Sequence, residues 1–164
     1  MRLRKKVILL GATGSIGSNA LRVIAHHPDR LELVAVVANS RFEPLAAIAR
    51  EYGARHIGLY EPAEDIDTRQ LPARAKLYRG IEEITHLVST VDAHIVLVAS
   101  AGTAALRPTL AAIEHGRTIA LANKEILVMA GRFVTEAAKR KGVRLIPVDS
   151  EHTAIFQCLE TGER

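Results

Sequence analysis

The 164-residue sequence contains no tryptophan, a single cysteine and few aromatic residues. With aromatic residues at 4% and no dense Lys/Arg stripe, the surfaces on which nucleic acids stack are scarce. Cys158 cannot form an internal disulfide, and its apolar context, FQCL, predicts a small core residue in a protein of a reducing compartment. The apolar run at residues 95–99 is far shorter than the ~20 residues of a membrane helix. We therefore expect no membrane span and no nucleic-acid partner.

The composition is that of an ordinary globular domain. Apolar residues make up 48% of the chain, and 22 basic residues face 18 acidic ones, for a net charge of +4. An interior of this size needs no disulfide or metal support. Only four apolar residues separate the basic start from Gly11, too few for a secretory signal, so we expect a cytoplasmic protein. The modest positive charge favours a phosphorylated small molecule as partner.

Hydrophobic periodicity predicts strands that alternate with helices. Apolar runs predict the strands, and apolar residues at helical spacing predict the helices. The predicted strands are residues 5–10, 31–38, 56–59, 93–100, 118–120 and 143–148, and the predicted helices are 15–26, 44–52, 81–89, 108–115, 128–141 and one from about Glu151. Residues 67–76 are predicted to be irregular. Such alternation indicates an α/β fold with a doubly wound, mostly parallel sheet of the Rossmann-like type.

The segment GATGSIG, residues 11–17, lies between the first predicted strand and the first predicted helix. Gly11 permits a tight turn, Gly14 lets the backbone approach a pyrophosphate, and Gly17 allows the helix to pack closely on the strand. Thr13 and Ser15 add hydroxyl donors. The spacing departs from GxGxxG, but its place after a strand favours dinucleotide binding over a purely structural turn.

The end of the second predicted strand indicates which dinucleotide is bound. An NAD site places an acidic residue here to bind the ribose hydroxyls, about 20 residues past the glycines. This sequence has Asn39, Ser40 and Arg41, and no acidic residue until Glu43. A guanidinium pairs well with phosphate oxygens, so the stretch predicts NADP(H), although Arg41 pointing into solvent is an alternative.

Two further polar segments follow predicted strands, at the sheet edge where ligands of open α/β folds bind. SAGTAALRPT, residues 100–109, either lines the cofactor cleft or forms a plain turn. LANKEILV, residues 121–128, carries Asn123 as a donor toward the nicotinamide and Lys124 as a cation for a substrate oxygen. A helix N-terminal turn with Glu125 as a capping residue is the alternative for this segment.

The segment PVDSEHTAIFQ, residues 147–157, brings Asp149 and Glu151 together at a spacing of two. In an extended segment both carboxylates would point to one side, which suits a hard divalent cation such as Mg²⁺ or Mn²⁺. Two ligands are too few for a dedicated cage. A helix cap formed by Ser150 or Asp149 is the alternative.

These motifs occur together in one known family. GATGSIG, SAG…LRPTLAAI, LANKEILV and PVDSEHTAIFQ follow the order and spacing of 1-deoxy-D-xylulose 5-phosphate reductoisomerases. Over practically all of its length the chain resembles the N-terminal, NADPH-binding part of that family. The resemblance implies an NADPH- and metal-dependent enzyme of non-mevalonate isoprenoid biosynthesis that rearranges and reduces 1-deoxy-D-xylulose 5-phosphate to 2-C-methyl-D-erythritol 4-phosphate.

The resemblance also implies roles for individual residues, motif by motif. Thr13, Gly14, Ser15 and Ile16 would contact the cofactor phosphates, Asn39, Ser40 and Arg41 the adenosine ribose phosphate, and Asn123 and Glu125 the rest of the cofactor. Lys124, Ser150 and Glu151 would hold the sugar phosphate, Lys124 and Glu151 being catalytic, and Asp149 with Glu151 would bind Mg²⁺ or Mn²⁺. Asn39, Ser40 and Arg41 stand where many members have Gly-Lys-Asn, which leaves the individual 2′-phosphate contacts open.

The resemblance gives the chain an expected domain organisation. Residues 1–150 would form the NADP-binding Rossmann-like domain, and residues 151–164 would begin the catalytic domain. The third metal carboxylate and the substrate phosphate site of the family, which is homodimeric at full length, would lie beyond Arg164, so we expect no turnover by this chain alone.

Two other interpretations compete with this one. Semialdehyde dehydrogenases need a nucleophilic cysteine, and Cys158 has no evident partner to stabilise its thiolate. A non-catalytic NADP-binding module stays open.

Overall fold

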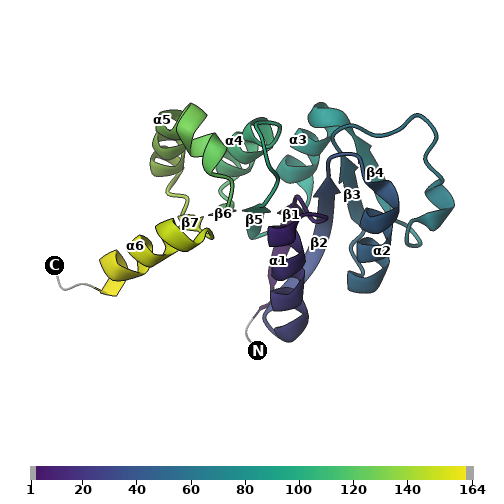
Figure 1. Ribbon diagram of the computed structural model, residues 1–164, viewed down its shortest axis with the longest axis horizontal. Helices are drawn as coiled ribbons and strands as arrows, with labels where there is room; N and C mark the ends of the chain where they lie inside the picture. The colour runs from purple at the N-terminus through teal and green to yellow at the C-terminus, as the bar shows by residue number, and fades with distance from the viewer. Residues whose placement is uncertain (1–2, 162–164) are drawn as a thin grey trace.

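The computed structural model describes residues 3–161, without the side chains at positions 150–152, 160 and 161. Helices and strands alternate along the chain (Figure 1). The strands are β1 (Lys5–Leu10), β2 (Leu31–Ala38), β3 (His56–Leu59), β4 (Lys76–Arg79), β5 (Ile95–Val98), β6 (Thr118–Leu121) and β7 (Leu145–Pro147). The helices are α1 (Ser15–His26), α2 (Phe42–Tyr52), the short 3₁₀ helix η1 (Thr68–Gln70), α3 (Gly80–Thr90), α4 (Leu106–Glu114), α5 (Lys124–Lys141) and α6 (Ser150–Thr161).

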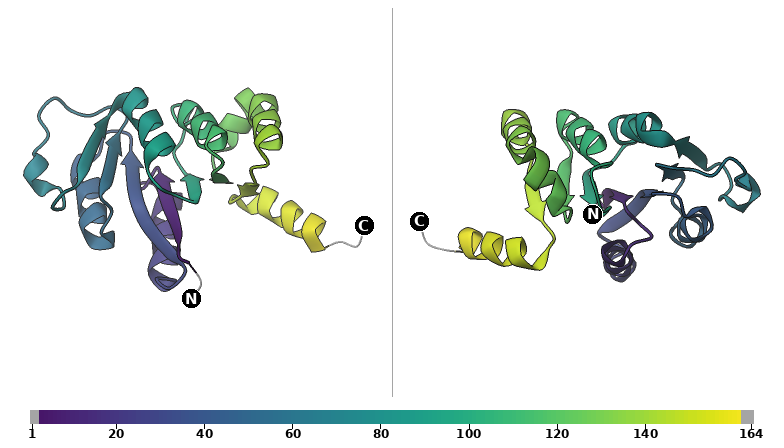
Figure 2. Two further views of the ribbon diagram at one scale, coloured as in Figure 1. Left: turned by 180° about the vertical axis from the view of Figure 1, so that it is seen from behind. Right: turned by 45° about the horizontal axis from the view of Figure 1, so that its top comes forward.

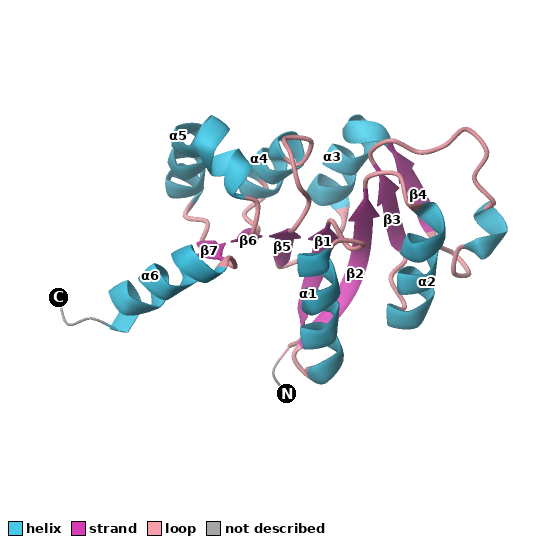
Figure 3. Ribbon diagram, viewed as in Figure 1, coloured by secondary structure: helices cyan, strands magenta, loops and turns pink. Residues whose placement is uncertain are grey.

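Within residues 3–161, seven parallel strands form one sheet in the order β4-β3-β2-β1-β5-β6-β7 (Figure 3). The chain winds outward from β1 to β4, crosses back to β5 beside β1, and winds outward again to β7. Such a reversal leaves a crevice at the carboxyl ends of the two strands on either side of it, here β1 and β5. The predicted doubly wound Rossmann-like fold is confirmed.

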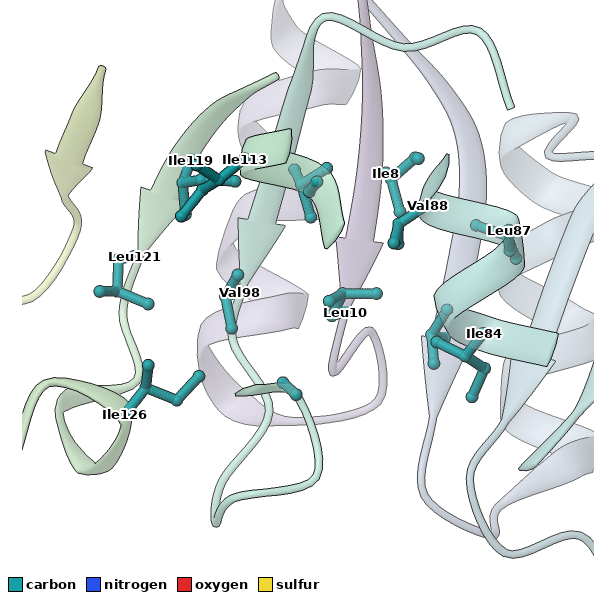
Figure 4. Packing of buried hydrophobic residues seen from close by; sticks show 14 of the residues in the cluster. Ile8, Leu10, Ile84, Leu87, Val88, Val98, Ile113, Ile119, Leu121 and Ile126 are labelled. Carbon is teal, nitrogen blue, oxygen red and sulfur yellow. The ribbon is translucent and has the colours of Figure 1, made fainter. Parts of the chain in front are cut away.

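Alternating side chains of the central strands build two apolar layers. In β1, Ile8 and Leu10 face the layer covered by α3, α4 and α5, whereas Val7 and Leu9 face the layer under α1 and α2. Figures 1 and 2 show the two sets of helices on opposite sides of the sheet, and Figure 4 shows the packing of the first layer. The central strands are apolar on both faces because both faces are covered.

The sequence missed one strand and misplaced the start of one helix. β4 begins at the last residue of the stretch predicted to be irregular and continues past it. As a four-residue edge strand with a single buried side chain, Tyr78, it has almost no apolar pattern. Helix α5 begins at Lys124 rather than at residue 128, because Asn123 caps it. The backbone at Ala130 is not helical, so α5 is a short first segment joined to a longer one.

The last helix begins within one residue of its predicted start, but two other expectations about this segment are wrong. Helix α6 begins at Ser150, so Glu151 lies in its first turn. The prediction of an extended segment that points Asp149 and Glu151 to one side is therefore wrong. Thr153 donates its backbone N–H to the Asp149 carbonyl oxygen at 3.0 Å, so Asp149 directly precedes the helix. Cys158 is exposed and not a core residue, because α6 packs mainly on β7 and projects beyond that edge of the sheet (Figure 2). In the described part of the chain no helix is long and apolar enough to cross a bilayer.

A candidate dinucleotide-binding cleft

A cleft of about 710 Å³ lies over the carboxyl ends of β1, β2, β3, β5 and β6. Its volume is in the range of about 300–1,000 Å³ that is usual for ligand sites. Every predicted cofactor residue except the buried Gly17 lines it, and so does Lys124. The cleft residues are Gly11, Thr13, Gly14, Ser15, Ile16, Asn39, Ser40, Arg41, Tyr60, Glu61, residues 99–104, Ala122, Asn123, Lys124 and Glu125. The fold thus brings together loops that are far apart in the sequence.

Two glycines of the turn between β1 and α1 are required by the fold itself. Gly11 has a φ of +92°, and a Cβ there would lie 2.4 Å from the backbone nitrogen of Ser100. A Cβ on Gly17 would lie 2.2 Å from the Gly11 carbonyl oxygen. At Gly14 a Cβ would make only ordinary contacts, at 3.5 Å or more. The protein's own packing therefore explains Gly11 and Gly17, whereas Gly14 borders the open cleft.

The N-terminus of α1 is free to receive an anion. Gly14 is its N-cap residue, no side chain caps the helix, and its first turn holds no acidic residue. The first helical bond runs from the Ser18 N–H to the Gly14 carbonyl oxygen at 2.9 Å, so the N–H groups of residues 15–17 have no acceptor within the helix. These donors and the positive end of the helix dipole favour a phosphate at the edge of the cleft.

Arg41 connects the end of β2 to this turn. Its guanidinium donates a hydrogen bond to the Thr13 carbonyl oxygen, which holds a positive charge beside the glycine-rich turn. Ser40 lines the same part of the cleft. A guanidinium with further donors on this wall can bind a phosphate that lies beyond the pyrophosphate position. The exposed Arg41 side chain is thus bonded to the turn, and its contact with a 2′-phosphate stays a prediction.

An acidic residue that sequence spacing missed also lines the cleft, where it is bonded to Asn39 at the end of β2. Glu61 follows β3, and its Oε2 accepts a hydrogen bond from Asn39 Nδ2 at 3.0 Å. The Glu61 N–H also donates to the Asn39 carbonyl oxygen at 2.8 Å. Both residues line the cleft. Glu61 is 22 positions from Asn39, so only the pairing of β2 with β3 shows that a carboxylate reaches the end of β2.

Asn123 joins two walls of the cleft. Its Nδ2 donates to the carbonyl oxygens of Ser100 at 2.6 Å and Gly102 at 2.7 Å, and its Oδ1 accepts from the Ile126 N–H at 3.1 Å. The side chain is buried, with a residue exposure of 3%, and both amide hydrogens are used within the protein. Asn123 therefore caps α5 and fixes the loop after β5, and the capping alternative holds for this residue rather than for Glu125.

Lys124 and Glu125 occupy the first turn of α5 and are exposed at the rim of the cleft. A cation at a helix N-terminus opposes the helix dipole, so capping does not account for Lys124. Among the residues with described side chains, none forms an ion pair with it. Lys124 thus offers an ammonium group to a ligand in the cleft.

Two buried hydroxyls at the cleft lack partners within the described part of the chain, those of Tyr60 and Ser100. Burial raises the pKa of Tyr60 far above its usual value, so its hydroxyl stays protonated. Unpaired buried donors are costly, and a ligand with many acceptor oxygens would offset that cost. The open helix terminus, the guanidinium and these hydroxyls together suit a dinucleotide bearing several phosphates.

Asp149, the described member of the predicted metal pair, is not among the residues that line this cleft. Asp149 is half-buried and borders a separate apolar cavity of about 250 Å³ between β7, α5 and α6. The side chains of Ser150 and Glu151 are outside the described residues. Among described side chains, no group of three or more His, Cys, Asp or Glu residues is placed to hold a metal ion.

Comparison with known proteins identifies the family. Residues 7–131 match the sequence profile of 1-deoxy-D-xylulose 5-phosphate reductoisomerase. Across 99% of the chain, the reductoisomerase of Phocaeicola vulgatus is 40% identical, and across 98% that of a Geobacillus species is 43% identical. The chain spans 43% and 42% of these two relatives, so it corresponds to about two fifths of their length.

Solved structures agree with the sequence comparison. The reductoisomerase of Zymomonas mobilis in complex with NADPH superposes with a TM-score of 0.87 at 38% identity, over 95% of this chain and 41% of that one. A reductoisomerase in complex with NADPH, fosmidomycin and magnesium gives 0.84 at 37% identity, over 94% of this chain and 38% of that one. A biliverdin reductase, with a TM-score of 0.61 at 21% identity, shares the fold alone. The chain belongs to the 1-deoxy-D-xylulose 5-phosphate reductoisomerase family and corresponds to its NADPH-binding region.

Proposed function

We propose that this chain binds NADPH in the cleft. The observation that carries the proposal is the uncapped N-terminus of α1, free of acidic residues, with the Arg41 guanidinium bonded to the turn that precedes it. The pyrophosphate would bind to the N–H groups of Ser15 and Ile16, and the 2′-phosphate would bind to Ser40 and Arg41. NADPH is a hydride donor when bound.

The nicotinamide end of the cofactor belongs near the start of α5. Asn123 orders the loop after β5 against this helix, and Lys124 and Glu125 present their side chains at the rim. In this proposal the carboxylate of Glu125 and the polypeptide around Asn123 bind the cofactor, while Lys124 binds the substrate and offsets negative charge on its oxygens.

The proposed reaction is that of the family: conversion of 1-deoxy-D-xylulose 5-phosphate to 2-C-methyl-D-erythritol 4-phosphate in isoprenoid biosynthesis. Lys124, Ser150 and Glu151 would hold the sugar phosphate, and Lys124 and Glu151 would be the catalytic residues. Asp149 and Glu151 would bind Mg²⁺ or Mn²⁺, which polarises substrate oxygens when bound. A magnesium-containing relative supports the metal. Carboxylates are suitable ligands for such a hard cation.

Cofactor binding and catalysis would lie in different parts of the polypeptide. Residues 1–150 form the cofactor-binding domain, and residues 151–164 belong to the catalytic part. Because the chain matches about two fifths of its relatives, we assign catalysis to a longer protein. We further propose that this longer protein is homodimeric and cytoplasmic. NADPH binding by this chain, without turnover, is the expected behaviour.

A charge placed on α1 tests NADPH binding directly. An aspartate is favourable in the first turn of a free helix, so Ser15→Asp should preserve folding, yet its carboxylate would occupy the phosphate position. We expect NADPH fluorescence titrations to show binding weakened about tenfold or more, the size of one repulsive contact with a phosphate. Asn19→Asp adds the same charge one turn further along the helix, outside the cleft, and should change affinity less than about twofold. Equal affinities of the two variants would refute the proposed phosphate position.

A further inference from the structure

The carboxylate of Glu61 lies at the place where Rossmann-like sites discriminate between their two nicotinamide cofactors. In NAD-binding sites an acidic residue at the end of the second strand accepts hydrogen bonds from the ribose hydroxyls. Here that position is held by Asn39, and the carboxylate comes from the neighbouring strand, bonded to the Asn39 amide at 3.0 Å. The backbone bond between the same two residues fixes this arrangement.

Opposite charges therefore line one cleft near the end of β2, Arg41 directly in sequence and Glu61 through its bond to Asn39. Arg41, bonded to the Thr13 carbonyl oxygen, favours a 2′-phosphate, whereas a carboxylate repels that group and suits the free ribose hydroxyls of NADH. Glu61 bonds only to Asn39 among the described side chains, so Arg41 does not neutralise it through an ion pair.

We propose that Glu61 is a specificity-determining residue that limits the preference for NADPH over NADH. The inference rests on the proposed cofactor function and assigns to that site a residue from outside the predicted motifs. Arg41 and Glu61 act in opposite directions on the 2′-phosphate: the guanidinium raises affinity for it and the carboxylate lowers it. Removal of the carboxylate charge makes the site more selective for NADPH.

The substitution Glu61→Gln separates charge from hydrogen bonding. Glutamine has nearly the same shape and keeps an oxygen that accepts from Asn39, so only the negative charge is lost. In calorimetric titrations we expect the affinity for NADPH to rise about three- to tenfold, from removal of one screened charge close to a dianion. The affinity for NADH should stay the same or fall. The NADPH gain should shrink as salt is added.

Glu43→Gln is the matched control. Glu43 lies in the first turn of α2, close in sequence to Arg41, but it does not line the cleft. The control removes the same charge from an exposed side chain outside the cleft, and it should leave the ratio of the two affinities within about twofold, because a charge that faces bulk water interacts weakly with a bound nucleotide.

The two affinities, measured for both variants and for the unsubstituted chain, decide the inference. A higher NADPH-to-NADH affinity ratio in Glu61→Gln alone supports it. An unchanged ratio, or a rise of equal size in Glu43→Gln, overturns it while NADPH binding itself stands. A fall in NADPH affinity would show that the carboxylate serves only to hold Asn39, which also overturns it. Failure of the unsubstituted chain to bind either nucleotide would instead refute the proposed function.

Discussion

The amide of Asn123 donates to the Gly102 carbonyl oxygen at 2.7 Å, and this bond ties the start of α5 to the loop after β5. The same amide binds the Ser100 carbonyl oxygen, and the side-chain oxygen caps the helix. One buried side chain therefore sets the position of the two loops that form the β5–β6 side of the cleft. Neighbouring Lys124 depends on it for its place at the rim.

Asn123→Asp should separate the two roles of this residue. A carboxylate still accepts from the Ile126 N–H, but it cannot donate to the carbonyl oxygens of Ser100 and Gly102 and repels them. We expect a loss of about 2–4 kcal/mol in the free energy of unfolding, the cost of two buried acceptors without donors. Urea denaturation measures this loss. Unchanged stability would show that the two loops are held by other contacts.

Arg41→Ala should lower the affinity for NADPH and leave that for NADH nearly unchanged. The lost group is the guanidinium at the end of β2, and charge-assisted bonds of this kind are worth about 1.5–3 kcal/mol, or roughly ten- to a hundredfold in affinity. Arg55→Ala is a suitable control, since Arg55 is exposed and precedes β3, at the opposite end of the strand from the cleft. Parallel calorimetric titrations with both nucleotides measure the effect. Equal losses for the two nucleotides would contradict a 2′-phosphate contact.

Lys124→Ala should act on the reaction rather than on cofactor binding. In the longer protein that contains this chain, we expect kcat to fall about a hundredfold or more, because the ammonium would stabilise charge that develops on the substrate. NADPH affinity should change less than about threefold, since none of the proposed phosphate contacts involves this side chain. Asp149→Ala should likewise lower kcat and weaken activation by Mn²⁺. Full turnover with poor NADPH binding in Lys124→Ala would show that Lys124 binds the cofactor and not the substrate.

His56, the first residue of β3, should make the stability of the protein depend on pH. Burial, and then the nearby Lys76, hold the pKa of His56 below its usual 6.5. The unfolded chain therefore takes up this proton more readily than the folded one, so the stabilisation is present above about pH 6.5 and is lost as the pH falls. Thermal unfolding between pH 7.5 and 5 should show a declining midpoint, with a smaller slope in His56→Gln. His86→Asn, at an exposed position on α3, should keep the original slope.

Local sequence pattern predicts the parts of the fold and site that depend on local chemistry. Gly11 and Gly17 are identified by their place between a strand and a helix, and the structure shows the close backbone contacts that require them. The apolar runs predict the central strands because both faces of the sheet are covered. Arg41 is equally easy to find in the sequence, as a basic residue that closely follows the second strand.

Other features depend on pairing between distant segments, which a local pattern does not contain. Glu61 reaches Asn39 only because β2 and β3 are neighbours in the sheet, and nothing in its own segment marks it. The edge strand β4 is stabilised by its ladder with β3 and has little apolar pattern. The exposure of Cys158 follows from the way α6 projects past β7, whereas its apolar sequence context suggests burial.

The central claim is that the glycine-rich turn, the end of β2 and the start of α5 bind one molecule of NADPH. Amide chemical-shift mapping of this 17.8 kDa chain during titration with NADPH tests it most directly. The account predicts perturbations gathered at residues 13–17, 39–41, 100–103 and 123–125, with little change at the amino ends of the strands. Perturbations centred on those amino ends or on α6, or none at all at millimolar NADPH, would contradict it.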